Sequence, residues 1–483
     1  VKLHAPARSG SRPRRLPAGT PMTEPIIIAP PPVATPASVA CAASSTDCGA
    51  ADEPAAGSAP ASTGSAGTSS TLGAGFNVLC TVLGTGLLQL PYGVRQSGWL
   101  GVPLLALMGL MACYTASVLG DLLFLVQERR TAREEALLSA PAPAAPLAPV
   151  TYGDIGMATF GRAGRLFVNV QMHVTLLMVA TIYHLLAALN VHWLCGLDLP
   201  SAALAVAGVV WLHVFLKSLG DLAVLSYLNL GINVTLCGAV IAQTLRHPPA
   251  TSPQRDIVVP DALSVGGAFA SFGFAYGCHP VLPDVLSSMR RPREFGRMIK
   301  ASFVVALALY VPLVIVAYAT YGRGVQSPMY ETPEISELPM MRVIKAATIL
   351  PMIFTYPLVL TPPEAALERV LGVDERPCPR LCRVGLRSLF VVFTTGVAIL
   401  VRTREHFGPL VDLVSSCTST FTAFLMPCVF GLRLRGIGGE RGVGRLELCV
   451  NIFVIVAAST GAIFGTIQAV EALSALGGGA ATR

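Results

Sequence analysis

The sequence has few charged residues. Asp, Glu, Lys and Arg make up 13% of its 483 residues, whereas a soluble globular protein has about 25%. Hydrophobic residues make up 53%, and the mean hydropathy is +0.63. This composition excludes an ordinary soluble enzyme and predicts an integral membrane protein that contacts the lipid bilayer. The net charge of +7 is spread over several loops, so we expect no nucleic-acid partner.

The sequence also lacks the clusters that metal centres and membrane enzymes need. Most of its 12 cysteines lie in apolar runs, where cysteine behaves as a small hydrophobic residue. Cys378 and Cys382 form a C-x-x-x-C pair with no second ligand pair nearby, so we expect no metal and no cofactor. The apolar segments hold no paired Asp, metal-spaced His or Ser/His set, which argues against an enzyme.

The first 71 residues show no apolar periodicity. They are rich in Ala, Pro, Ser, Thr and Gly, and such a segment cannot bury enough apolar surface to offset its ordering entropy. We therefore expect residues 1–71 to form a disordered cytoplasmic tail. Arg12, Arg14 and Arg15 precede no apolar run of useful length, so a secretory signal is not expected there.

The rest of the chain is a series of apolar segments. A spanning helix needs about 20 mostly apolar residues, and eleven such windows can be marked, of which the fourth is short. They are residues 72–94, 99–126, 164–190, 201–216, 220–245, 262–288, 299–321, 338–362, 384–401, 407–432 and 446–471. The expected fold is an all-α, integral membrane protein with one transmembrane domain over residues 72–471 and a short tail over 472–483.

The basic residues predict the orientation of these helices. If the N-terminus is cytoplasmic and eleven helices alternate, the cytoplasmic segments hold 25 of the 34 Lys and Arg residues. Cytoplasmic loops carry such an excess in membrane proteins. One missed or invented helix would invert every later loop, so the asymmetry supports eleven spans. It places the C-terminus in an organelle lumen or outside the cell.

Two apolar segments contain helix breakers at mid-span. Residues 84–99 read GTGLLQLPYGVRQSGW, and residues 264–289 read SVGGAFASFGFAYGCHPVLPDVLSSM. They lie in the first and sixth windows, which correspond to each other in two five-helix halves. Paired interrupted helices in an inverted repeat are the best sequence indication of a transporter site at the bilayer midplane. The alternative is that these residues merely kink packed helices.

The chemistry of such breaks suits a zwitterion. Near Gly84 and Gly86, the free N–H groups of a starting half-helix carry partial positive charge and suit a carboxylate. Near Phe272–Phe274, the carbonyls of an ending half-helix suit an ammonium group. Glycine lets a ligand approach the backbone closely. The pair of breaks therefore predicts an amino acid substrate.

These motifs resemble those of the amino acid/auxin permease family, in its vacuolar and vesicular-inhibitory-amino-acid branch. The similar stretches are GTGLLQLPYGVRQSGW, TYGDIGMATFGRAGRLFVNV, DLAVLSYLNLG, FGFAYGCHPVLPDVLSSMRRPREF and YPLVLTPPEAALERVLG, in consistent order between about 72 and 471. The resemblance implies an eleven-helix LeuT-like fold with a 5+5 inverted repeat. It also implies secondary transport of amino acids, commonly driven by protons.

Particular residues follow from the two breaks. The expected substrate-binding residues are Thr81, Gly84, Thr85, Gly86, Phe272, Tyr276 and Gly277. A place in the packed core is the alternative for the two aromatic residues.

His279 and Asp284 are the expected proton-coupling residues, because ionisable groups inside a membrane are functional candidates. The alternative for His279 is a neutral ring bonded to backbone carbonyls, and for Asp284 a place in the cytoplasmic vestibule. Many relatives carry an Asn where this chain has Cys80, and thiols are poor ligands for hard cations, so sodium is less expected than protons.

Two function classes remain open from the sequence. One is a secondary active amino acid transporter with alternating access around the two broken helices. The other is an amino acid sensor on the same fold with little transport. A vacuolar, endolysosomal or plasma membrane would suit either.

Overall fold

Helices form nearly all the regular structure of the described residues. The computed structural model describes residues 69–137, 149–215, 223–259, 261–401, 404–436 and 442–480, all within one compact unit. The tail expected over 1–71 therefore lies almost wholly outside the described residues. Among the described residues, Ser69 and Met289 form an isolated parallel β-bridge.

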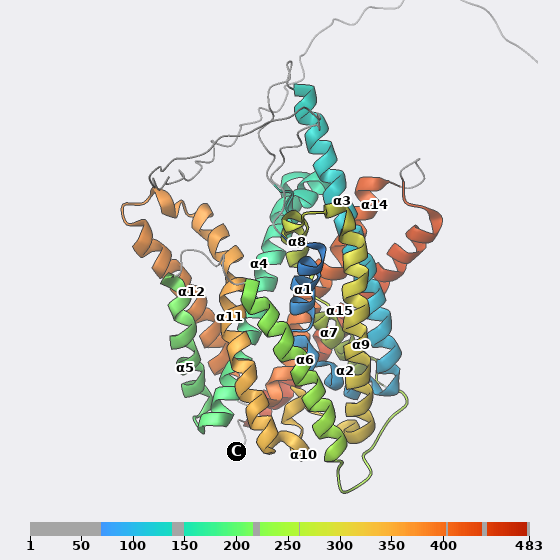
Figure 1. The fold of residues 1–483 in the computed structure, drawn as a ribbon, viewed down its shortest axis with the longest axis vertical. Helices are drawn as coiled ribbons and strands as arrows, with labels where there is room; N and C mark the ends of the chain where they lie inside the picture. Colours follow the sequence, from blue (N-terminus) through green and yellow to red (C-terminus); the bar gives the residue numbers. More distant parts are fainter. Residues whose placement is uncertain are drawn as a thin grey trace, which may run out of the picture. The chain divides into compact units, whose positions relative to one another are not determined.

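The helices follow one another with short connections (Figure 1). Their bounds are α1 Thr71–Val82, α2 Leu90–Ser97, α3 Gly101–Leu137, α4 Tyr152–Cys195, α5 Leu199–Trp211, α6 Ala223–Arg246, α7 Ala262–Ala275, α8 Leu282–Ser288, α9 Phe295–Tyr321, α10 Pro333–Ser336, α11 Pro339–Val370, α12 Pro379–Leu400, α13 Phe407–Val414, α14 Met426–Arg435 and α15 Arg445–Ala480. Several run past the expected windows: α4 begins at Tyr152, well before the window 164–190, and α15 stays helical where we expected a short tail.

Local capping explains where several helices begin. The Ser70 hydroxyl caps α1, and the carboxylate of Asp261 accepts hydrogen bonds from the first N–H groups of α7. Thr151 and Asp154 form a reciprocal capping box at the start of α4. Such caps satisfy N–H groups that have no partner inside the helix.

Both expected helix breaks are present. α1 ends at Val82, and a 3₁₀ turn over Thr85–Leu88 leads into α2. α7 ends at Ala275, and a second 3₁₀ turn over His279–Val281 leads into α8. Gly273 lies within α7, so the second break begins later than the glycine pattern predicted.

A third irregularity was not predicted. Between α13 and α14, residues Ser415–Ser419 and Phe421–Leu425 form π-helical turns. π-helical turns are rare in proteins, and those that occur often lie at functional sites.

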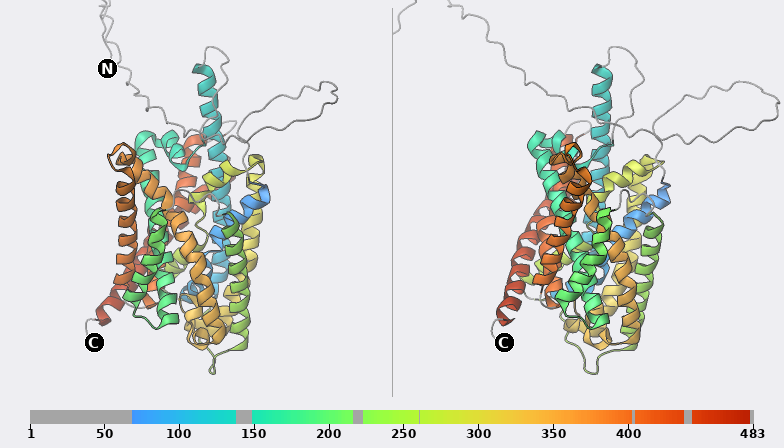
Figure 2. Two further views of the ribbon diagram at one scale, coloured as in Figure 1. Left: turned by 60° about the vertical axis from the view of Figure 1, so that its left-hand side comes forward. Right: turned by 90° about the vertical axis from the view of Figure 1, so that its left-hand side faces the viewer.

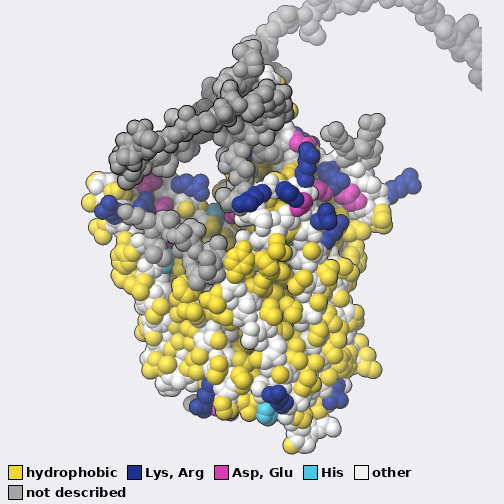
Figure 3. Space-filling view, in the orientation of Figure 1, with side chains coloured by type: hydrophobic (Ala, Val, Ile, Leu, Met, Phe, Trp, Pro, Cys, Tyr) yellow, Lys and Arg dark blue, Asp and Glu magenta, His cyan; other side chains and the backbone are white. Residues whose placement is uncertain are grey.

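The surface agrees with a membrane protein. Figure 3 shows a wide hydrophobic belt on the side facing the viewer, with Lys and Arg side chains at its two ends. By length and composition, eight helical stretches of the described residues can cross a membrane. α1 and the stretch Leu199–Phe215 are shorter apolar helices. The helix lengths therefore establish a multi-pass helical protein without fixing the count at eleven.

The broken helices lie inside the bundle. α7 packs against α2 and α15, and α9 packs against α1, α3 and α6, while α4 and α11 form another extensively packed pair. Figures 1 and 2 show α8 near one end of the bundle and α10 at the other. We call these ends the α8 side and the α10 side.

Candidate functional site

The two helix breaks are in direct contact. A Cβ atom added to Gly86 would lie 2.6 Å from the Cα atom of Ala275 at the end of α7. The hydroxyl of Tyr310, on α9, donates to the carbonyl oxygen of Val82 at 2.5 Å and lies 3.4 Å from that of Ala275. Glycine at position 86 is therefore required for the close approach, and Tyr310 joins the two interrupted backbones.

The first break contains the start of a 3₁₀ turn. The N–H groups of Thr85 and Gly86 are the first of this turn, so they have no partner within it. At the second break, the carbonyl of Phe272 accepts a hydrogen bond from the N–H of Tyr276 at 3.2 Å, and that of Phe274 accepts from Gly277 at 3.2 Å and also from Tyr276. A carbonyl oxygen has two lone pairs, so that of Phe272 can accept one further donor.

Gly84 lies beside a small cavity between four helices. Its lining residues come from the first break, α4, α6 and α11. They are Gly84, Leu88, Tyr183, Asn229, Asn233, Leu236, Thr348, Pro351, Met352 and Thr355. The cavity volume is about 20 Å³, which is room for one or two water molecules. An amino acid would enter only if the surrounding helices moved apart.

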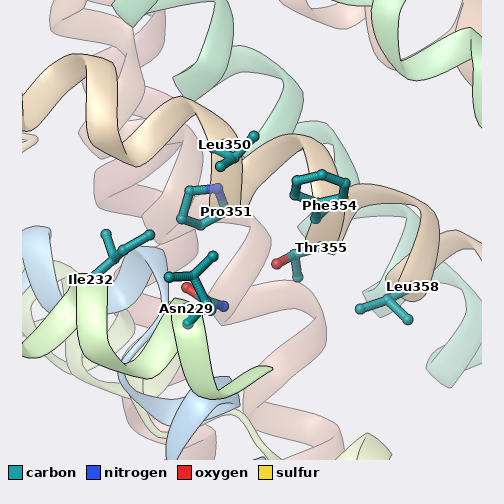
Figure 4. A pocket seen from close by; sticks show the side chains of 8 residues that line it. Asn229, Ile232, Leu350, Pro351, Phe354, Thr355 and Leu358 are labelled. Atoms are coloured by element: carbon teal, nitrogen blue, oxygen red, sulfur yellow. The ribbon is translucent and has the colours of Figure 1, made fainter. Parts of the chain in front are cut away.

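A second pocket adjoins this cavity between α6 and α11. The two share Asn229, Pro351 and Thr355, and Figure 4 shows Asn229 and Thr355 on its two walls. Leu228 and Leu350, which also line the second pocket, are 51% and 46% exposed. The space beside Gly84 thus continues toward the surface along the seam between these helices.

The other predicted substrate residues have different surroundings. Thr81 is exposed, and its hydroxyl donates to the carbonyl of Asn77. Phe272 is buried against Gly93, and Tyr276 stacks on Phe303. Neither aromatic residue lines the cavity at Gly84.

Gly277 faces the π-helical segment. A Cβ atom there would lie 3.6 Å from Ser419 Oγ and 3.2 Å from the carbonyl of Phe274. Gly277 therefore belongs to the second break but not to the cavity beside Gly84.

The two predicted proton-coupling residues also differ in their surroundings. His279 is fully buried in the second break, and its Nε2 lies 3.0 Å from the hydroxyl of Thr115 on α3. Its Nδ1 has no hydrogen-bond partner. Asp284 is exposed near the start of α8.

Several buried charged residues were not singled out from the sequence. Lys345 forms an ion pair with Glu331 at 2.8 Å, Glu364 lies 2.9 Å from His213 Nε2, and Asp412 is fully buried on α13. A charged residue in or beside an apolar window was the available signal. No group of three or more His, Cys, Asp or Glu residues within the described ranges could hold a metal ion.

The family profile described as transmembrane amino acid transporter protein matches residues 67–471. This chain belongs to that family. The match covers most of the sequence and includes both broken helices.

The Arabidopsis thaliana amino acid transporter AVT1D is 27% identical to this family member over 427 residues, covering 83% of this chain and 69% of the relative. Amino acid transporter AVT1I of the same plant is 26% identical, with 77% and 88% covered.

Among solved structures, MhsT in complex with L-phenylalanine is 10% identical with a TM-score of 0.49, covering 84% of this chain and all of that chain. The Eremococcus coleocola manganese transporter is 13% identical with a TM-score of 0.42, covering 83% and 95%.

Proposed function

We propose that this family member is a secondary active transporter of amino acids that alternates access around its two broken helices. One observation carries the proposal: the two breaks touch each other beside a small cavity that Asn229, Asn233 and Thr348 help to line, in a chain of the amino acid transporter family. Irregular backbone at membrane depth is tolerated only where protein covers it or it lines a cavity.

In this proposal the fold has eleven spans in a LeuT-like 5+5 inverted repeat. The interrupted pairs α1–α2 and α7–α8 each count as one span, and α13–α14 counts as another. The α8 side faces the cytoplasm, since it carries the basic segments 290–300 and 369–387.

The substrate would bind at the first break. The N–H groups of Thr85 and Gly86 would receive its carboxylate, with Gly84 and Thr81 beside it. Carbonyls at the second break, near Phe272 and Gly277, would receive its ammonium group when the helices move apart. Tyr276 would also contact the substrate, because it borders the same break.

Protons, rather than sodium, would drive transport. His279 is a buried titratable group within the second break and Asp284 follows it on the proposed cytoplasmic side, so both are retained as coupling candidates. An acidic vacuole or endolysosome would supply the gradient.

Uptake by proteoliposomes tests the proposal. The full chain is reconstituted and offered a panel of labelled amino acids, with and without a pH gradient and with sodium or potassium outside. Accumulation that requires the gradient and is indifferent to sodium is expected, and a protonophore should abolish it. Binding without accumulation would instead indicate a sensor, and a strict sodium requirement would overturn proton coupling. His279→Ala and Asp284→Asn then show whether either residue sets the pH response.

A further inference from the structure

Asp412 is a buried carboxylate at the meeting point of the broken helices. It lies on α13 and is 0% exposed. α13 packs against α7 and α15, and hydrogen bonds join Asp412 to both broken helices. Its place in the core therefore links three elements that alternating access would have to separate.

The side chains that donate hydrogen bonds to the Asp412 carboxylate are all neutral. The Ser271 hydroxyl on α7 donates at 2.5 Å, and the Gln96 amide on α2 donates at 2.8 Å. The Gln89 amide, between the 3₁₀ turn and α2, donates at 3.4 Å. The Ser327 hydroxyl in turn donates to Gln89. One carboxylate thus holds together α2, α7 and α13 on the α10 side.

No ion pair reaches Asp412 among the residues that the structure describes. Charged or titratable side chains toward this end of the surrounding elements include Tyr92, Arg95, Arg404, Glu405, His406 and Glu471. Arg95 donates instead to the carbonyl of Val325 at 2.8 Å, and Arg404 pairs with Glu331 at 3.1 Å. Tyr92 is uncharged near neutral pH, and His406 precedes α13.

The neighbouring polar side chain of α15 is also neutral. A Cβ atom at Gly267 would lie 2.7 Å from both Gln468 Oε1 and Gln96 Nε2, so the amide of Gln468 lies close to the donors of Asp412. The cluster contains hydroxyl and amide groups but no cation to balance a carboxylate.

A carboxylate in such surroundings is costly when it is ionised. Removing an unpaired charge from water carries a large penalty, and the group takes up a proton instead. We propose that Asp412 binds a proton when α2, α7 and α13 are packed together as in this structure, and releases it when they separate and water enters. Acid on the α10 side then favours closure of that side.

The first test does not depend on transport. Purified full-length protein is titrated from neutral to acidic pH, and the infrared absorption of protonated carboxyl groups is recorded for the wild type, Asp412→Asn and Asp121→Asn. Asp121 is exposed on α3 and serves as the matched control. A band that persists at neutral pH should be lost in Asp412→Asn alone. The same band in all three proteins would overturn the proposal.

The second test rests on the proposed function. In proteoliposomes, Asp412→Asn should remove the dependence of net uptake on the pH of the α10 side, while exchange of labelled for unlabelled substrate continues. Asp121→Asn should keep the wild-type profile. A pH response that survives in Asp412→Asn but disappears in His279→Ala or Asp284→Asn would overturn the role of Asp412. No uptake by the wild type would refute the proposed function and leave the infrared result to decide.

A milder variant covers the case in which Asp412→Asn does not fold. Ser271→Ala removes a donor that favours the ionised carboxylate, so the infrared band should persist to higher pH, by up to about one pH unit. A midpoint that does not move, or moves to lower pH, contradicts the proposal.

Discussion

At the scale of single residues, close backbone contacts and buried charges constrain how the helices pack. Gly86 shows the first, because its missing side chain allows the two breaks to touch. Lys345 shows the second. It is 0% exposed, its ammonium group pairs with Glu331, and it lies 3.7 Å from the centre of the Trp193 ring. Both residues constrain which helices approach each other in this arrangement.

Gly86→Ala should impair the protein. The added methyl group would lie 2.6 Å from the Cα atom of Ala275, and because that atom belongs to the backbone, the two breaks must move apart. Such overpacking costs about 1–3 kcal/mol. We expect a lower melting midpoint in detergent and strongly reduced uptake.

The control for Gly86→Ala is Gly238→Ala on α6, where an added Cβ atom meets nothing within 4 Å. This variant should be neutral or more stable by up to about 1 kcal/mol, since alanine favours helix. If the two variants behaved alike, the contact between the breaks would not be important.

At the scale of helices, the interrupted elements depend on their caps. α7 has 14 residues and ends at the second break, so its position depends strongly on how it begins. Asp261 caps it with hydrogen bonds from Leu263 and Ser264. The hydrogen bond from the Ser264 hydroxyl holds the pKa of Asp261 below its usual range.

Removing this cap should destabilise the protein in a pH-dependent way. Asp261→Ala should cost about 1 kcal/mol, whereas Asp261→Asn keeps an oxygen acceptor and should cost less. Because the folded-state pKa is lowered, the contribution of the wild-type carboxylate is present at neutral pH and is lost as the pH falls through that pKa. Melting midpoints of the three proteins across acidic pH measure this. Curves that stay parallel at all pH values would contradict the account.

At the scale of the whole molecule, hydrogen bonds join the helices on the α10 side, whereas α6 and α11 leave a pocket between them. On the α10 side, hydrogen bonds join α2, α7, α13 and the segment at Ser327. Beside Gly84, a pocket continues between α6 and α11. This arrangement is the one expected if access to the cavity comes along the α6–α11 seam while the α10 side is closed.

The topology of the chain is testable independently of transport. With eleven spans, a tag at residue 1 should be cytoplasmic and a tag at residue 483 should lie across the membrane, because an odd number of crossings separates the termini. Protease protection in sealed vesicles measures this. Both tags on one side would show that the proposed helix count is wrong.

The sequence by itself determined the membrane class, the family and the two interrupted helices. Low charge, long apolar windows and clustered Gly and Pro can each be recognised within one segment of the sequence, without knowing which segments pack together. It also placed Gly84, Gly86 and His279 at the breaks. Tertiary structure decided what sequence spacing cannot encode. In the folded chain, Phe272 and Tyr276 lie in the packed core, and Asp284 is exposed. Asp412 is buried, and Gln89, Gln96 and Ser271 donate hydrogen bonds to it. These positions depend on which faces of distant helices meet, and that is fixed only when side chains from many segments pack together.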